Sequence, residues 1–286
     1  FLLRSAPILM IIGTILLILV LFFGSSGGGA QRWLDLGFIR FQPSEIMKII
    51  VPITIAAILS EKTLPPRALS VIISLITIAL VVFLIAKQPD LGTSLLIGAS
   101  GIYVLFFSGF GIRLVKIIWL NLLILSSLLM GSLYIAWNYL LISYQKNRIL
   151  TLFNPESDPL GSGYHIIQSK IAIGSGGLTG KGLTNGSQSQ LDFVPEQSTD
   201  FIFSVLAEEF GFLGFILLIA IYSLIIYRCF SLSLRCEDNF FRLLGSSLTF
   251  VFFTYVFVNI GMVSGLLPVV GLPLPLICLL YTSVVS

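Results

Sequence analysis

Apolar residues are gathered into seven long runs that are separated by shorter polar connectors. Each run approaches the roughly 20 apolar residues that a helix needs to cross the hydrocarbon core of a bilayer. We therefore predict seven transmembrane helices, at residues 6–23, 44–60, 68–86, 93–110, 117–137, 201–227 and 243–267. An eighth apolar run begins near Leu276, and we expect this helix to be truncated.

The segment 138–200 is too polar to span a bilayer and too long for a simple connector. Within it, Tyr164, Ile167 and Ile171 fall on one face of a short predicted helix at 164–173. That helix either lies at the membrane interface or packs against the bundle. The predicted fold is an all-α polytopic membrane protein, a single domain over 1–286 with a large extracytoplasmic loop between its fifth and sixth helices.

The composition agrees with a membrane protein. Hydrophobic residues make up 56% of the chain and charged residues 10%, whereas a soluble domain carries about 25% charged residues. The net charge of +3 is too small to indicate a nucleic-acid partner. A single histidine argues against a His-based metal site or triad, and the three cysteines lack paired spacing. Because the chain opens at Phe1, we expect a fragment of a longer protein.

The basic residues of the short connectors indicate the orientation. One side carries Arg4, Lys62, Arg67, Arg113, Lys116, Arg228, Arg235 and Arg242, and the other carries Arg32, Arg40 and Lys87. Lys and Arg accumulate in cytoplasmic loops, so the first side is predicted to be cytoplasmic. The segment 138–200, with Asp200 at its end, then faces outward and away from cytosolic ATP.

Three charged residues are expected to meet near the outer surface. Glu45 and Lys48 are three residues apart at the start of the second predicted helix, which puts them on one helix face. Asp90 stands at the outer end of the third predicted helix and could pair with Lys48. These groups form either a self-contained ion pair near the interface or the lining of a polar cavity. An acidic and basic set from two helices at one depth favours the cavity.

Trp33 lies in the connector after the first predicted helix, close to Arg32 and Arg40. It is either an aromatic residue of the membrane interface or a platform for a sugar face or a lipid headgroup, and the two arginines could meet phosphate. The glycine-rich stretch 175–181 fails the GxxxxGK[ST] pattern of a phosphate loop at both ends. Its glycines are expected to form turns or to bring backbone N–H groups to an anion.

The stretch 192–211, DFVPEQSTDFIFSVLAEEFG, carries a polar segment into an apolar run. Asp200 immediately precedes that run, and Glu208 and Glu209 lie inside it. Carboxylates at such depth are costly and usually functional. Asp200 is either a helix N-cap or a carboxylate at the membrane surface that acts as a general base or metal ligand. Earlier acids of the stretch, including Glu196, could share a hard cation with Asp200.

Five segments resemble the RodA/FtsW family, also called SEDS proteins, and the resemblance is closer to RodA than to FtsW. They are GAQRWLDLGFIRFQPSEIMK (29–48), KQPDLGTSL (87–95), NPESDPLGSGYHIIQSKIAIGSGGLTGKG (154–182), FVPEQSTDFIFSVLAEEFG (193–211) and NIGMVSGLLPVVGLPLPL (259–276). The family has ten transmembrane helices with cytoplasmic ends, so the resemblance makes 6–23 the third helix. The tail 277–286, ICLLYTSVVS, departs from the family's pattern and is interpreted as an artefact of sequence assembly.

The resemblance implies a peptidoglycan glycosyltransferase of the bacterial inner membrane that acts in cell elongation. Lipid II and a growing lipid-linked glycan would give a longer glycan and undecaprenyl pyrophosphate. Asp200 matches the family's essential outer-loop aspartate and would be the base. The resemblance implies that six residues bind substrate: Trp33, Gln42, Glu45, Lys48, Asp90 and Glu196. Arg40 is added to them as the possible phosphate contact noted above. A divalent cation, Mg²⁺ or Mn²⁺, is expected without assigned ligands, and the implied partner is a class B penicillin-binding protein.

Two rival functions remain open at this point. A lipid II flippase also needs buried charges along a polar cavity, but the sequence has no evident inverted repeat. A non-catalytic scaffold would only activate the transpeptidase, and it would tolerate substitution of Asp200.

Overall fold

A computed structural model describes residues 2–27, 30–35, 40–60, 66–88, 90–110, 138, 143–154, 156, 162–190 and 199–278. The chain divides into two compact units, each of which is discontinuous in sequence. Unit 1 contains Phe1–Leu125 and Tyr227–Val251, and unit 2 contains Ser126–Ile226 and Phe252–Ser286. The prediction of a single domain over 1–286 stays a prediction.

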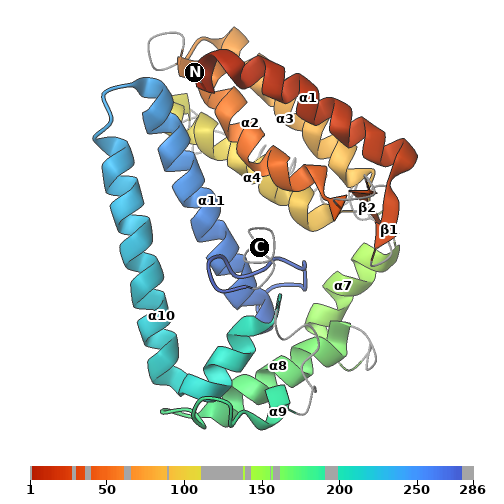
Figure 1. The fold of residues 1–286 in the computed structure, drawn as a ribbon, viewed down its shortest axis with the longest axis vertical. Coiled ribbons are helices and arrows are strands. Elements are labelled where there is room, and N and C mark those ends of the chain that lie inside the picture. Colours follow the sequence, from red (N-terminus) through yellow and green to blue (C-terminus); the bar gives the residue numbers. More distant parts are fainter. Residues whose placement is uncertain are drawn as a thin grey trace. The chain divides into compact units, whose positions relative to one another are not determined.

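Unit 1 is built on four helices, drawn from red to yellow in Figure 1. They are α1 (Leu2–Phe23), α2 (Pro43–Ser60), α3 (Ala68–Ala86) and α4 (Leu91–Leu105), which continues as a π-helical turn, η1 (Phe106–Phe110). α2 contacts α1, α3 and α4 and is the most buried of the four. α1 instead exposes a row of large apolar side chains, including Ile8 and Ile11. In a bilayer, such a row faces lipid and not water.

A small sheet follows α1, and it was not predicted. Its strands are β1 (Ser25–Gly27), β2 (Ala30–Asp35) and β3 (Arg40–Phe41), in the order β1-β2-β3 and antiparallel throughout. The register pairs Ser25 with Trp33 and Asp35 with Arg40. These strands are too short for an alternating pattern to stand out from a polar connector, so the all-α prediction was wrong in this detail.

The described part of unit 2 contains the helices of the large polar segment. They are α7 (Ser143–Phe153), α8 (Ser162–Gly176) and α9 (Ser187–Gln190). α8 confirms the short helix predicted at 164–173. Its buried face holds Ile166, Ser169 and Ala172, whereas Ile171 on the predicted apolar face is exposed. The face that packs inside the protein is therefore not the one that the apolar pattern indicated.

Two long helices, α10 (Ile202–Leu234) and α11 (Asn239–Val263), contribute residues to both units. α11 begins four residues before its predicted start because the Asp238 carboxylate accepts a hydrogen bond from Phe240 N (2.8 Å) and caps the helix. It ends at Val263 because Gly265 adopts a left-handed conformation (φ 72°) beyond the last turn.

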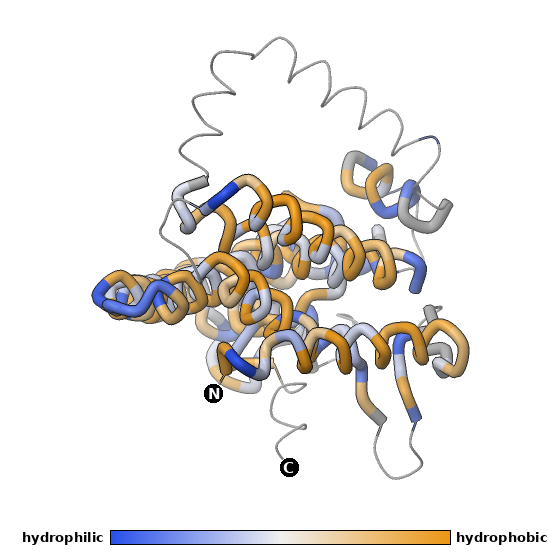
Figure 2. Tube along the Cα trace, turned by 90° about the horizontal axis from the view of Figure 1, so that it is seen from above, coloured by the Kyte–Doolittle hydropathy of each residue, from blue (hydrophilic) through white to orange (hydrophobic). Residues whose placement is uncertain are grey.

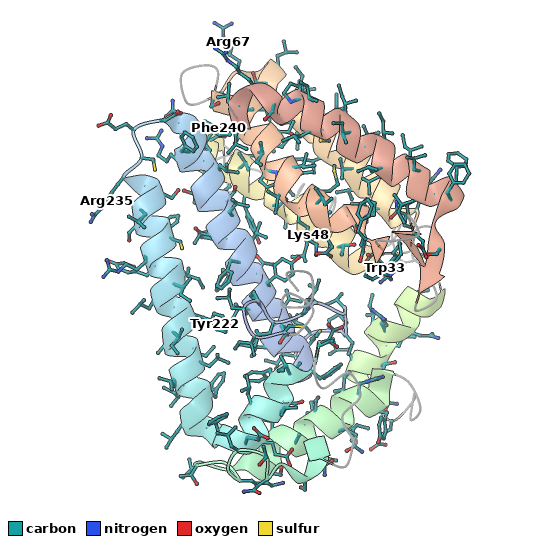
Figure 3. The ribbon with its side chains drawn as sticks, viewed as in Figure 1. Trp33, Lys48, Arg67, Tyr222, Arg235 and Phe240 are labelled. Atoms are coloured by element: carbon teal, nitrogen blue, oxygen red, sulfur yellow. The ribbon has the colours of Figure 1, made fainter. Side chains whose placement is uncertain are left out.

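Six helices within the described residues are long and apolar enough to cross a membrane, and each coincides with a predicted run. Figure 2 shows hydrophobic residues along their lengths. The predicted helix at 117–137 lies outside the described residues. At the eighth run, Pro275, Leu276 and Ile277 form a turn, and the chain beyond Cys278 lies outside them too. Arg67 and Arg235, which were assigned to the cytoplasmic side, lie at the same end of unit 1 (Figure 3).

Candidate functional site

The first polar cluster forms in unit 1, where α2 and α4 begin. The Asp90 carboxylate caps α4 by accepting a hydrogen bond from Thr93 N (3.4 Å). Its Oδ2 accepts a hydrogen bond from Gln42 Nε2 (3.1 Å) and lies 3.5 Å from Arg32 Nε. Gln42 also donates to Ser44 Oγ (2.8 Å). The carboxylate is almost fully buried, so these partners compensate for its lost hydration.

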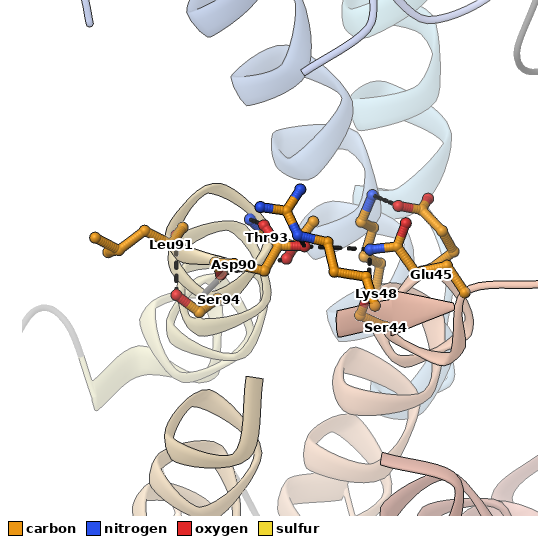
Figure 4. A network of polar contacts seen from close by, with 9 residues as sticks. Ser44, Glu45, Lys48, Asp90, Leu91, Thr93 and Ser94 are labelled. Carbon is orange, nitrogen blue, oxygen red and sulfur yellow. Dashed lines mark hydrogen bonds and ion pairs between the residues drawn. The ribbon is translucent and has the colours of Figure 1, made fainter. Parts of the chain in front are cut away.

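Lys48 and Glu45 form the second part of this cluster (Figure 4). Lys48 Nζ lies 2.5 Å from Glu45 Oε1, one turn away on α2, as their spacing predicted. The Lys48 side chain is 9% exposed, whereas that of Glu45 is 46% exposed. The Glu45–Lys48 ion pair was one of the two predicted alternatives, whereas Asp90, which could have paired with Lys48, is paired with Arg32. The sequence therefore predicted which residues form the cluster, but not the pairing of Asp90 with Arg32.

Three other residues were predicted to bind substrate, and they are Trp33, Arg40 and Glu196. Trp33 lies in β2 and is partly buried, and its carbonyl accepts a hydrogen bond from Ser25 Oγ (3.3 Å). The backbone of Arg40 lies in β3, and its side chain is outside what the structure describes. Glu196 is also outside the described residues.

Asp200 lies in unit 2, two residues before the start of α10, and is partly buried. Its carbonyl oxygen accepts a hydrogen bond from Asn259 Nδ2 of α11 (2.8 Å). A Cβ built on Gly271 would lie 3.3 Å from Asp200 Oδ2, so this glycine directly adjoins the carboxylate. The next residue, Phe201, is buried and stacks on His165 of α8 (ring centroids 5.6 Å apart). The backbone around Asp200 is therefore held from several elements.

The proline-rich segment 268–275 beside Asp200 is fixed by side chains from three helices. Prolines 268, 273 and 275 lack an N–H, which limits hydrogen bonding within the segment. Its carbonyl groups instead accept hydrogen bonds from Arg148 Nη1 at Val269 O (2.9 Å), from Asn259 Nδ2 at Leu272 O (2.6 Å) and from Tyr222 Oη at Pro275 O (2.7 Å). The same Asn259 Nδ2 also donates a hydrogen bond to Asp200 O.

Glu208, the first of the two acids inside the apolar run, is fully buried in unit 2. Its Oε1 accepts hydrogen bonds from Lys181 Nζ (2.7 Å), Gln188 N (3.0 Å), Ser187 Oγ (3.2 Å) and Ser175 Oγ (3.3 Å). The glycine-rich stretch therefore does form turns, as predicted, and the group that it surrounds is a carboxylate of the protein itself. Glu208 joins α10 to the polar segment that leads to Asp200.

Asn259, Arg148 and Tyr222 were not predicted as functional residues from the sequence. Asn259 did carry a signal, because an amide inside the apolar run 243–267 has to find partners in a membrane. Arg148 and Tyr222 carried none, since each acts through a carbonyl group more than fifty positions further along the chain.

Comparison with known proteins adds the family. The family model for FtsW, RodA and SpoVE, described as a cell cycle protein family, matches residues 1–285. The chain belongs to this family. The peptidoglycan glycosyltransferase MrdB of Escherichia coli K12 is 52% identical over 272 residues, which cover 95% of this chain and 72% of MrdB. These matches confirm the predicted resemblance to the RodA/FtsW family.

Two solved structures resemble this family member along nearly its whole length. One comes from a peptidoglycan synthase complex that coordinates polymerization and crosslinking; it has a TM-score of 0.78 and 35% identity, covering 97% of this chain and 75% of that one. The other is the crystal structure of the rod shape determining protein RodA from Thermus thermophilus, with a TM-score of 0.63 and 29% identity, covering 96% of this chain and 71% of that one.

Proposed function

We propose that this protein is a peptidoglycan glycosyltransferase that polymerises lipid II into glycan strands during cell elongation. The observation that carries the proposal is the 52% identity to a peptidoglycan glycosyltransferase across 95% of the chain. The polar clusters agree with it, because side chains that the family resemblance assigned to substrate binding gather at the starts of α2 and α4.

In the proposed reaction, Asp200 is the general base. Its carboxylate takes the proton from the 4-hydroxyl of the acceptor N-acetylglucosamine, and that oxygen attacks the anomeric carbon of the donor's N-acetylmuramic acid. The bond from this carbon to the pyrophosphate breaks, and undecaprenyl pyrophosphate leaves with the electron pair. The α-linkage becomes β in one inversion. A positioned base of this kind contributes about 10²–10⁴-fold to the rate, and pyrophosphate needs no protonation to leave.

We assign the cluster in unit 1 to binding of the lipid-linked pyrophosphate. Lys48 and Arg32 supply positive charge, and the buried Asp90 holds Arg32 in place. Glu45 orients Lys48 through their ion pair. Fixed cations that meet a departing anion stabilise the charge that develops in the transition state. Trp33, Arg40 and Glu196 stay in the proposal as substrate contacts.

We propose that Mg²⁺ or Mn²⁺ also takes part. Within the part of the chain that the structure describes, no three His, Cys, Asp or Glu side chains gather into a metal site. Mg²⁺ often needs no such cage, because one or two carboxylates and the substrate's phosphates hold it, and Asp200 is a hard oxygen donor of this type. When bound, the cation supplies charge neutralisation for pyrophosphate.

The proposal places the reaction at the outer face of the bacterial inner membrane, because the charge distribution assigns Asp200 to that side. We also propose a class B penicillin-binding protein as partner. Support comes from the structural relative that was solved in a complex for polymerization and crosslinking. A polymerase whose product is crosslinked at the site of synthesis would assemble with such an enzyme.

The first prediction tests the base. Asp200→Ala and Asp200→Asn in the full-length protein should lower lipid II polymerisation by at least about 10²-fold, since no other group is assigned to take the proton. Polymer formation by purified protein in detergent or lipid is the measurement. Asp238→Asn is the matched control, because asparagine preserves the cap at α11, and it should polymerise at the parent rate.

Three results would contradict the proposed function. Polymerisation by Asp200→Ala at the parent rate would remove the base. A parent protein that moves labelled lipid II across vesicles without forming polymer would be a flippase, and an inactive parent that only stimulates the transpeptidase would be a scaffold.

A further inference from the structure

Asp200 lies where a loop enters a helix, a place where a backbone is free to shift unless other groups hold it. Among the described residues, Asn259 of α11 holds the Asp200 main chain through a hydrogen bond from Asn259 Nδ2 to Asp200 O (2.8 Å). Asn259 is fully buried, and 59 residues separate the two along the chain. The tether therefore joins α11 to the entrance of α10 within unit 2.

The Asn259 amide is used entirely as a donor. Its nitrogen also donates to Leu272 O (2.6 Å), so both N–H groups meet carbonyl oxygens. The amide oxygen is buried and has no hydrogen bond within the described residues. Turning the amide over would place this oxygen against two carbonyls, which fixes the assignment of the nitrogen. Both N–H groups are committed to carbonyl oxygens, so removal of the amide would leave two acceptors without this donor, at a cost of about 1–3 kcal/mol for each one that is buried.

The second hydrogen bond of Asn259, to Leu272 O, holds a backbone segment that lies beside the Asp200 carboxylate. Leu272 belongs to the segment 268–275, whose ends are held by Arg148 at Val269 O and by Tyr222 at Pro275 O. Between these anchors, Gly271 adopts φ 71° and adjoins Asp200 Oδ2. One amide thus fixes both the backbone of Asp200 and the segment against which its side chain rests.

We propose that Asn259 is a positioning residue for Asp200, and that Gly271 is a glycine because the carboxylate needs the space of its missing side chain. The inference rests on the proposed role of Asp200 as base. Asn259 does not touch the reacting atoms. It keeps the Asp200 carboxylate in register with the acceptor hydroxyl, and displacement of a catalytic group by about 1 Å is enough to cost about 10²-fold in rate.

The second prediction tests the tether in the full-length protein. Asn259→Ala and the near-isosteric Asn259→Asp, which when ionised has no donor, should lower kcat for lipid II polymerisation about 10- to 100-fold. KM for lipid II should stay within about twofold, because no substrate contact is lost. In an Asp200→Ala background, Asn259→Ala should leave the residual rate unchanged, since no base remains to be positioned.

Ser169→Ala is the matched control for these variants. Ser169 is fully buried in α8 and donates to Val263 O of α11 (2.8 Å), so it also joins two elements of unit 2, without contacting Asp200. It should retain kcat within about twofold. If Ser169→Ala lowers kcat as much as Asn259→Ala does, the effect is general loosening and the inference fails.

The third prediction tests the same inference through Gly271, which adjoins the Asp200 carboxylate. It applies even if the Asn259 variants do not fold. Gly271→Ala places a methyl group 3.3 Å from Asp200 Oδ2, so the carboxylate has to shift, and kcat should fall by about 10-fold or more. Gly265→Ala is its matched control. It has nearly the same backbone strain (φ 72°), but its methyl group meets mainly the flexible end of Lys170.

The outcomes separate this inference from the proposed function. Inactive Asp200→Ala together with Asn259→Ala and Gly271→Ala at the parent rate would overturn the positioning role and leave the base assignment intact. Full activity of Asp200→Ala would overturn the base assignment itself. A fall in kcat that Gly265→Ala reproduces would assign the effect of Gly271→Ala to backbone strain and also count against the inference.

Discussion

At the scale of single residues, two adjacent glutamates show how position decides what a carboxylate does. Glu208 is fully buried, and its Oε1 accepts hydrogen bonds from Lys181, Gln188, Ser187 and Ser175. Glu209 is more exposed and accepts one from Thr184 N (3.0 Å). The sequence marked both as costly acids in an apolar run. In the structure, Glu208 holds the glycine-rich segment in place, a use that the cost alone did not specify.

The fourth prediction compares these neighbours. Glu208→Ala removes the buried carboxylate that joins α10 to the glycine-rich segment and should destabilise the protein by about 1.5–3 kcal/mol, the range for hydrogen bonds to a charged group. Glu209→Ala should change stability by less than about 0.5 kcal/mol, as surface substitutions do. Thermal unfolding of the purified protein in detergent is the measurement. Equal shifts for the two variants would mean that Glu208 does not organise the segment.

At the scale of elements, α10 is broken at Gly211, where φ is 65° and ψ is −160°. A continuous helix would bond Phe212 N to Glu208 O and Leu213 N to Glu209 O. The loop after α8 enters this gap with four bonds, Lys181 N to Glu208 O, Gly182 N to Glu209 O, Phe212 N to Gly177 O and Leu213 N to Leu178 O, all of 3.0–3.1 Å. All four freed groups are satisfied, so a break in an apolar helix is tolerated.

The fifth prediction orders three glycine-to-alanine substitutions by their effect on stability. Gly174→Ala, in the open face of α8, should be neutral or stabilise by up to about 1 kcal/mol. Gly177→Ala (φ 59°) has free space but a left-handed backbone and should cost about 1–2 kcal/mol. Gly211→Ala should cost the most, because its backbone conformation is essentially restricted to glycine and its methyl group would overlap Gly180 and Leu178.

Thermal unfolding again gives the order, and hydrogen exchange at the amides of Lys181 and Gly182 reports the loop directly. Gly211→Ala should speed exchange there, whereas Gly174→Ala should not. A Gly211→Ala protein with parent stability and parent exchange would show that the loop does not depend on the break.

At the scale of the whole molecule, each unit carries one part of the proposed machinery. Unit 1 carries the charged cluster of Lys48, Glu45, Arg32 and Asp90, and unit 2 carries Asp200 with its tether. The apolar helices expose large side chains widely, most of all along α10. Such a surface requires a bilayer around it, so activity measurements belong in detergent or lipid. The proposed cation is checked by treating the protein with EDTA, which should lower polymerisation, and then adding Mg²⁺ or Mn²⁺, which should restore it.

The sequence by itself determined the six transmembrane runs that the structure describes and the residues of the charged cluster. It could do so because lipid cannot hydrogen-bond a backbone, so a long apolar run has to be a helix whatever surrounds it. Local spacing was equally sufficient for the Glu45–Lys48 pair, one turn apart.

Only the tertiary structure decided the small sheet, the break in α10, the pairing of Asp90 with Arg32, and the tether from Asn259 to Asp200. Each of these depends on hydrogen bonds or ion pairs whose partners are set by packing and not by sequence spacing. An amide in an apolar run indicates that hydrogen-bond partners are needed. Which carbonyl groups it meets is decided by the packing of α11 against the segment 268–275 and the start of α10.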